Sequence, residues 1–180
     1  MGRKTPHARA TSGKEQSPLL YEMEVALTGG PVTEAFVKAN PAVLRTILIR
    51  GDQTLKSLHD AIFKALDRYE EHMYEFQIGG KGPMDPEARR YVLPMAMDDP
   101  FMDQQPAGDV TRTTIGELEL KLNEAFDYWF DFGDDWWHVI EVTAIHDEIP
   151  PGRYPKITKK KGASPPQHMD REDEDGDNEG

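Results

Sequence analysis

The chain has 180 residues, which is enough for one domain with a sizeable core and short for two. It contains no cysteine, so disulfide scaffolds, thiolate metal sites and cysteine nucleophiles are excluded, and any metal site must use His, Asp or Glu. The net charge is −12, and residues 19–154 hold twelve basic and twenty-five acidic side chains, a balance that repels nucleic-acid phosphates and favours basic partners.

The two ends of the chain differ in composition from its middle. Residues 1–18 are polar, basic and without apolar periodicity, and residues 155–180 carry a lysine run followed by a dense acidic group. Such segments bury too little apolar surface to offset the entropy lost on ordering, so we expect two disordered ends around one domain over residues 19–154. No apolar run approaches about 18 residues, and no signal-peptide core is present at the start. We therefore expect a cytoplasmic protein without membrane contact.

The first predicted elements are two strands and one helix. Apolar and polar side chains alternate over residues 21–27, and residues 43–50 are rich in β-branched and apolar side chains; both patterns indicate β-strands. Thr54 is a good helix N-cap. The apolar residues that follow it at three- and four-residue spacing are Leu55, Leu58, Ile62, Leu66 and Tyr69. This spacing predicts the main helix, which packs on the sheet through these side chains.

A third strand and a second, shorter helix follow. Residues 72–78 alternate again and predict a strand. Residues 81–112 are rich in Pro, Met and Asp, with only residues 90–93 resembling a short strand, so we expect a long loop that could cover a pocket. Thr114 and Glu117 form a capping-box pattern, which predicts that a short helix begins here.

The most distinctive segment is a predicted hairpin. Aromatic residues recur at every second position over residues 126–132, a Gly-Asp-Asp turn follows, and the alternation resumes over residues 136–142. Two long strands joined by a tight turn fit this pattern best. The elements together predict an α+β fold: a mixed, largely antiparallel sheet of about five strands with one main packed helix and a short second helix.

The turn of this hairpin is the first candidate site. Asp131, Asp134, Asp135 and His138 gather three carboxylates and an imidazole within eight residues, a set that can bind a divalent cation. His72 lies on a strand that could run beside His138, which gives a candidate metal set of His72, Asp134, Asp135 and His138. The competing interpretation is that Asp and Gly only satisfy the turn, in which case no cofactor is expected.

The same two histidines suggest a second chemistry. His72 and His138 would suit general acid and base work near neutral pH. Both, however, fall among the apolar positions of their strands, where a histidine commonly has a structural role.

A dense aromatic group is the third candidate. Successive strand residues face opposite sides of a sheet, so some of these rings must face outward, and Trp137 is the best outward candidate because Trp136 and His138 face the other way. Exposed Trp and Tyr anchor protein interfaces and can also stack unpaired bases, whereas the competing interpretation is packing within the core or across the strands. The hypothesis of a binding surface covers Tyr128, Trp129, Trp136, Trp137, His72 and His138.

Four segments of this chain follow one another in an order known from a protein family. They are LYEMEVAL, LRTILIRGDQTLKSLHDAIFKAL, HMYEFQIGG and FDYWFDFGDDWWHVIEV, and the most specific part runs from Phe130 to His138. The chain resembles the plasmid pRiA4b ORF-3-like family over residues 19–154. The resemblance implies a compact α+β domain, found in bacterial and archaeal genomes and on mobile elements, with no established biochemical activity and no accepted catalytic residues. Tyr74 and Ser164 stand where relatives usually have His and Cys.

The function predicted from these observations is a non-catalytic binding or accessory module with an unidentified protein partner, to which the resemblance adds an association with mobile elements. An alternative is a metal-assisted hydrolase or ligand-binding enzyme that uses the His and Asp cluster around a divalent metal. A second alternative is a nucleic-acid accessory factor that relies on the basic N-terminal arm and stacked aromatic rings, because the acidic core disfavours contact with nucleic acid.

Overall fold

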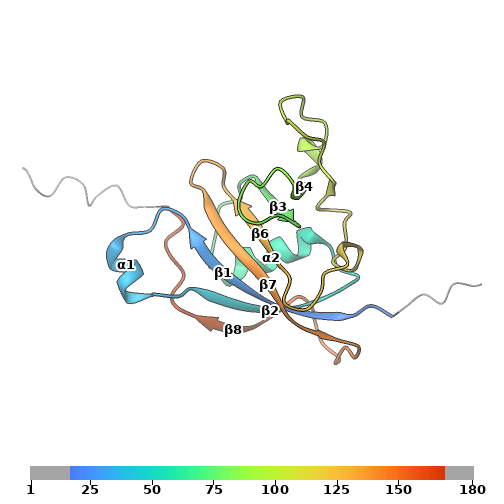
Figure 1. The fold of residues 1–180 in the computed structure, drawn as a ribbon. Helices are drawn as coiled ribbons and strands as arrows, with labels where there is room; N and C mark the ends of the chain where they lie inside the picture. Colours follow the sequence, from blue (N-terminus) through green and yellow to red (C-terminus); the bar gives the residue numbers. More distant parts are fainter. Residues whose placement is uncertain (1–16, 169–180) are drawn as a thin grey trace, which may run out of the picture.

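The computed structural model describes residues 17–168, which form an eight-stranded sheet with helix α2 packed on it (Figure 1). The strands follow the order β5-β4-β3-β6-β7-β1-β2-β8, and all neighbouring pairs are antiparallel except β4 with β5. The strands are β1 Leu20–Gly29, β2 Leu44–Arg50, β3 Tyr74–Ile78, β4 Arg89–Val92, β5 Gly108–Asp109, β6 Ala125–Phe130, β7 Trp136–His146 and β8 Lys156–Lys161; the helices are α1 Glu34–Ala39 and α2 Leu55–Ala65.

The predicted α+β class and the largely antiparallel sheet are confirmed, but the expected count of about five strands was too low. The five predicted strands are β1, β2, β3, β6 and β7, although β3 begins at Tyr74 rather than at His72. The other three lack a strong signal. β4 and β5 are short pieces within the predicted long loop, and β8 is rich in lysine rather than apolar residues.

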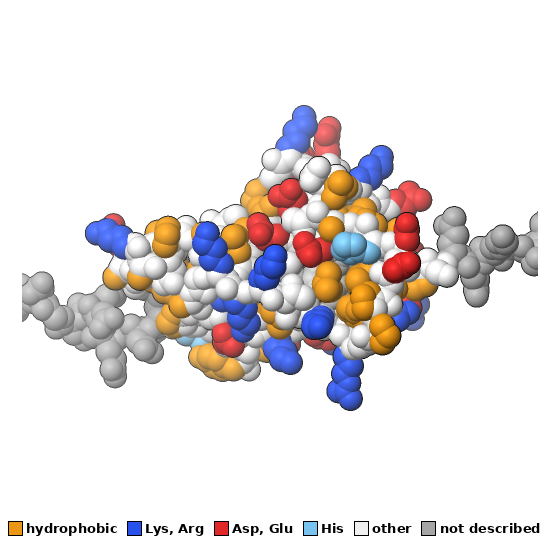
Figure 2. Space-filling model, turned by 90° about the horizontal axis from the view of Figure 1, so that it is seen from below, with side chains coloured by type: hydrophobic (Ala, Val, Ile, Leu, Met, Phe, Trp, Pro, Cys, Tyr) orange, Lys and Arg blue, Asp and Glu red, His pale blue; other side chains and the backbone are white. Residues whose placement is uncertain are grey.

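β8 corrects the predicted domain boundary. The domain was expected to end at residue 154, with a disordered tail beyond it, yet residues 156–161 pair with β2 and the structure continues to residue 168. A strand at the edge of a sheet needs backbone pairing on one side only, and lysines protect such an edge from further pairing. Lys and Arg side chains are spread across the face of the molecule seen from below (Figure 2). The remaining tail, residues 169–180, and all but the last two residues of the predicted N-terminal arm lie outside the described residues.

The main helix forms as its sequence predicts. The Thr54 hydroxyl accepts a hydrogen bond from the Ser57 amide, and the helix buries its apolar side chains against the sheet. Tyr69 is an exception to the predicted apolar face, with 72% of its surface exposed, because the helix ends at Ala65 and the chain turns away. The opposite wall of the core consists of sheet residues such as Phe76 and Phe130.

The predicted capping box is also present. The Glu117 carboxylate accepts a hydrogen bond from the Thr114 amide (2.7 Å), and a short 3-10 turn over Gly116–Leu118 follows. Helix α1 was not predicted from the sequence. It follows the N-cap Thr33, has six residues and buries none of them, so its apolar pattern is too short to stand out. Within residues 17–168 no helix is both long enough and apolar enough to cross a membrane.

A buried arginine joins the C-terminal segment to the domain. Arg45, on β2, is 1% exposed, and its guanidinium donates hydrogen bonds to the carbonyl oxygens of Ala65 (2.8 Å) and Lys161 (2.9 Å) and to the hydroxyl of Ser164 (3.0 Å). The ends of α2 and β8 thus share one donor group.

Replacing Arg45 by Met should destabilise the fold. Methionine can fill the space of the arginine stem, but it leaves the carbonyls of Ala65 and Lys161 without their donor, and each buried unsatisfied acceptor costs about 1–3 kcal/mol. We expect the free energy of unfolding to fall by about 3 kcal/mol, measured by urea denaturation. The exposed Arg153 is the control: Arg153→Met should change it by less than about 0.5 kcal/mol. Equal losses in both variants would contradict this role of Arg45.

Candidate functional site

The β6–β7 hairpin separates its aromatic residues onto two sides of the sheet. Tyr128 and Trp136 face the core and are 0% and 1% exposed, whereas Trp129 and Trp137 face outward and are half-buried. The two outward residues are direct cross-strand partners, and their rings stack with centroids 5.0 Å apart and planes 7° apart. Phe132, 38% exposed, adds a third ring 4.1 Å from that of Trp129. We call Trp129, Phe132 and Trp137 the aromatic face.

Carboxylates border the aromatic face. The alternation of the strands puts Asp127 of β6 and Glu141 of β7 on the same side of the sheet as the two outward tryptophans. Asp135, in the turn, accepts a hydrogen bond from the indole N–H of Trp129 (2.9 Å) and so fixes the orientation of that ring. Burial raises the pKa of Asp127. The outer side of the hairpin therefore combines flat aromatic surface with acidic groups.

A network of buried polar groups lies on the inner side of the hairpin. His138 is 0% exposed; its Nδ1 lies 3.0 Å from the carbonyl oxygen of Tyr128 and its Nε2 lies 2.8 Å from a nitrogen of Arg68. Since the carbonyl and the guanidinium fix one nitrogen as donor and the other as acceptor, the imidazole is neutral. Burial, with the charge of Arg68, holds the pKa of His138 well below its ordinary value. Contacts within the protein engage both ring nitrogens, so His138 has a structural role.

A second histidine of the network was missed by the sequence analysis. His59, on α2, is 1% exposed; its Nδ1 lies 2.6 Å from the hydroxyl of Tyr128, its Nε2 lies 3.0 Å from the carboxylate of Glu71, and its ring stacks on Tyr74 at 3.6 Å. Burial, followed by the nearby charges of Lys56 and Arg68, lowers the pKa of His59 to about 3. Its position on the buried face of the predicted helix was the signal that could have revealed it.

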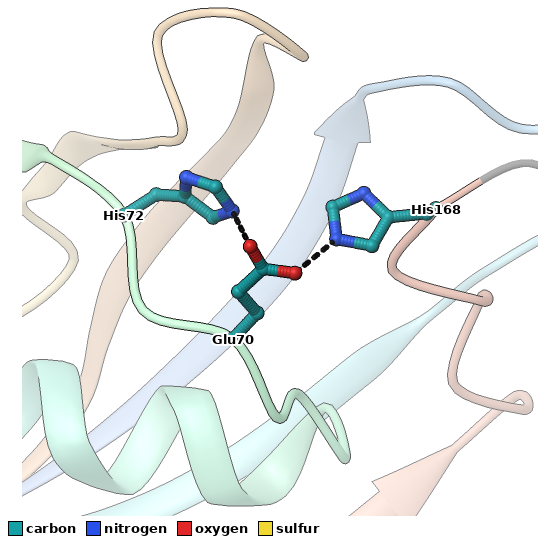
Figure 3. A group of neighbouring side chains, drawn as sticks. All are labelled: Glu70, His72 and His168. Atoms are coloured by element: carbon teal, nitrogen blue, oxygen red, sulfur yellow. Dashed lines mark hydrogen bonds and ion pairs between the residues drawn. The ribbon is translucent and has the colours of Figure 1, made fainter.

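A polar cluster gathers three distant segments beside the turn of the hairpin. We call Glu70, His72, Asp131, Asp134 and His168 the polar cluster; its central three members are drawn in Figure 3. The Nε2 atom of His72 lies 3.7 Å from Glu70 and 3.5 Å from Asp131, and His168 lies 2.9 Å from Glu70 through Nε2 and 3.4 Å from Asp134 through Nδ1. The hydrogen bond to Glu70, with the nearby Asp134, raises the pKa of His168.

Backbone contacts hold the polar cluster in place. The side-chain oxygen of the buried Gln167 accepts hydrogen bonds from the amides of Tyr69 (2.9 Å) and Glu70 (3.1 Å), and its amide group donates to the carbonyl of Glu70 (2.6 Å). The amide of Asp131 donates to the carbonyl of Met73 (2.8 Å), which ties the turn to the segment before β3. The convergence of the three segments is therefore part of the fold.

The structure brings together only two of the four metal ligands predicted from the sequence. His72 and Asp134 both belong to the polar cluster, but Asp135 is engaged with the indole of Trp129, and His138 is enclosed in the core with both nitrogens occupied. The predicted pairing of His72 with His138 for acid and base work is not formed for the same reason. Of the predicted binding surface, Trp129 and Trp137 face outward, whereas Tyr128, Trp136 and His138 are core residues.

Comparison with known proteins shows what the chain is related to. The sequence model of the plasmid pRiA4b ORF-3-like protein family matches residues 35–174. The chain belongs to this family. The match confirms the resemblance seen in the sequence, and it includes β8 and the segment that carries His168.

A solved structure of another protein has a similar fold. The crystal structure of a protein of unknown function, MM3350 from Methanosarcina mazei Go1, has a TM-score of 0.62 and 20% identity to this chain, and the alignment covers 84% of this chain and 74% of the other. At this level of identity the likeness concerns the fold alone. No curated protein matches the chain.

Proposed function

We propose that this pRiA4b ORF-3-like chain is a cytoplasmic, non-catalytic binding module whose aromatic face takes a basic segment of a protein partner. The observation that carries the proposal is the outward stacking of Trp129 on Trp137 beside carboxylates. Large rings in a fixed orientation supply contact area at a small entropic cost, which is why Trp and Tyr dominate the energetics of many interfaces.

The charge of the surroundings supports a basic partner. An Arg or Lys side chain over a Trp ring gains a cation–π interaction of about 0.5–2 kcal/mol, and carboxylates near the ring add Coulomb attraction. Asp135 and Glu141, both exposed, provide such carboxylates, and the net charge of −12 attracts basic partners from a distance. The same negative charge repels the phosphates of a nucleic acid.

The test is a comparison of partner capture by the wild type and by a Trp137→Ala variant. Tagged protein is incubated with native lysate, half of which has been treated with nuclease, and the retained proteins are quantified by mass spectrometry. We expect a basic protein that survives nuclease treatment and whose capture falls at least about tenfold in the variant, because losing a central aromatic anchor costs about 1.4 kcal/mol or more. The free energy of unfolding should change by only about 1 kcal/mol, since Trp137 is half-buried.

Phe101 provides the matched control. It is 92% exposed and lies in the loop between β4 and β5, so Phe101→Ala removes an exposed ring outside the aromatic face. Capture should be unchanged in this variant. If both variants lose capture equally, the retention is non-specific, and if nuclease abolishes it, the partner is a nucleic acid; either result would refute the proposal.

A further inference from the structure

The strongest unassigned feature of the molecule is the polar cluster. Glu70 and His72 come from the connection between α2 and β3, Asp131 comes from the turn of the hairpin, and His168 comes from the segment after β8. We infer that Glu70, His72 and His168, with Asp131 beside them, bind one divalent transition-metal cation, for which Zn²⁺ is the best chemical match. The proposed ligands are not members of the aromatic face, and metal binding here does not rest on the partner proposed above.

The first argument is the Nε2 atom of His72. This atom is buried, yet it has no hydrogen-bond partner among the described residues, although two carboxylates lie near it. A buried polar atom without a partner costs about 1–3 kcal/mol, so native structures rarely leave one unsatisfied without a reason. A cation held between the nitrogen and the carboxylates would satisfy all three groups at once.

The second argument is the spacing of the ligand atoms. Zinc binds His nitrogen and carboxylate oxygen at about 2.0–2.2 Å in tetrahedral geometry, which places neighbouring ligand atoms about 3.4 Å apart. His72 Nε2 lies 3.5 Å from Asp131 and 3.7 Å from Glu70, too far for good hydrogen bonds but close to this spacing. Glu70, His72 and His168 each offer an atom within 4.8 Å of the others, so small side-chain movements would complete the site.

The third argument is the set of groups that hold the ligands. A metal-binding histidine commonly donates its second N–H to a carboxylate, which fixes the ring and increases the basicity of the ligand nitrogen. The Nδ1 atom of His168 lies 3.4 Å from Asp134, in position for this contact. Asp131 accepts the amides of Gly133 (3.1 Å) and Asp134 (3.2 Å) through Oδ1, which leaves Oδ2 toward His72.

The chemistry of the donors selects the metal. Two imidazoles and carboxylates without thiolates suit Zn²⁺ and its neighbours in the transition series, whereas Mg²⁺ and Ca²⁺ prefer oxygen ligands alone. A second group of possible ligands, His59 with Asp60 and Glu71, is less suitable for Zn²⁺ because it offers only one imidazole nitrogen beside two carboxylates.

The experiment is a calorimetric titration of the untagged full chain with ZnCl₂ in the presence of millimolar MgCl₂, which saturates carboxylate groups that bind cations without imidazole. Wild type should bind about one Zn²⁺ per chain, and zinc should raise its melting temperature, because the cation links three segments. Glu70→Gln and His168→Gln should each weaken zinc binding at least about tenfold, since each removes one ligand. Circular dichroism confirms that the variants are folded; His168 is partly exposed, so its replacement leaves the core intact.

His146→Gln is the matched control, because His146 is an exposed histidine at the end of β7, outside the polar cluster. It should bind zinc like the wild type. The inference is overturned if the wild type binds no zinc, or if Glu70→Gln and His168→Gln bind it as tightly as His146→Gln does.

Discussion

Replacing Gly30 by Ala is expected to lower the free energy of unfolding by about 4 kcal/mol or more, the largest effect of any single methyl group that we predict for this fold. Gly30 follows β1 and has φ +147°, a conformation that residues with a Cβ rarely adopt. A Cβ atom at this position would also collide with the indole ring of Trp136. That ring is 1% exposed and lies 5.3 Å from the guanidinium of Arg68, so it has no free space into which to move.

A Gly152→Ala variant distinguishes the two causes of this loss, which are the backbone strain and the collision with Trp136. The φ of Gly152, +150°, nearly equals that of Gly30, but a Cβ added there meets no atom within 4 Å. Gly152→Ala should therefore cost only the backbone strain, about 1–2 kcal/mol. Urea denaturation of both variants measures the difference, which is the cost of displacing Trp136. Equal losses would mean that the Trp136 ring moves aside freely and that it is not fixed as described.

The β6–β7 hairpin shows how much of the fold the local sequence pattern predicts. Its period-two alternation predicted two strands, the turn between them and the outward direction of Trp137, because strand geometry alone assigns successive side chains to opposite faces. The same rule was incomplete for β3, where Glu75 is as buried as its apolar neighbours because Arg90 of β4 pairs with it at 2.8 Å. A contact between strands decides that burial, and no single strand pattern contains it.

The polar cluster shows where local sequence fails. His168 lies 98 residues from Glu70, in a segment whose composition predicted disorder, and it reaches Glu70 only because the neighbouring Gln167 binds the backbone there. The hydrogen bonds from Arg45 to Lys161 and Ser164 are a second contact of this kind with the C-terminal segment. Contacts made by single side chains produce no periodic pattern in the sequence. The sequence therefore grouped His72 with Asp134, which the structure also brings into one cluster, but it chose His138, the histidine closest in sequence to Asp134, as their partner.

The two buried histidines should make the protein sensitive to mild acid. Both His59 and His138 are neutral in the fold, with the pKa of His59 lowered to about 3, whereas in the unfolded chain each has a pKa near the ordinary value of about 6.5. Above that value neither group affects stability. As the pH falls below it, the unfolded chain takes up protons that the folded chain does not, so the free energy of unfolding decreases by up to about 1.4 kcal/mol per pH unit for each histidine.

The expected loss is about 4 kcal/mol between pH 6.5 and 4.5. Asp127, Glu71 and His168 act in the opposite direction, because their pKa values are raised in the fold, by burial for the two carboxyls and by the hydrogen bond to Glu70 for His168. Their protonation then favours the folded chain. The measured loss should therefore stay below the full sum for two histidines. Urea denaturation at a series of pH values between 8 and 4.5 gives this dependence directly.

His59→Gln identifies the source of the pH dependence. Glutamine cannot take up a proton, so the slope of unfolding free energy against pH between 6.5 and 5 should fall to about half, whatever the variant loses in absolute stability with its contact to Tyr128. His146, which is exposed at the end of β7, provides the control, and His146→Gln should leave the slope unchanged. A slope that does not respond to His59→Gln would mean that His59 is protonated within the fold. The buried network would then carry a positive charge between His59 and Glu71, and the neutral hydrogen-bond arrangement through Tyr128 would be wrong.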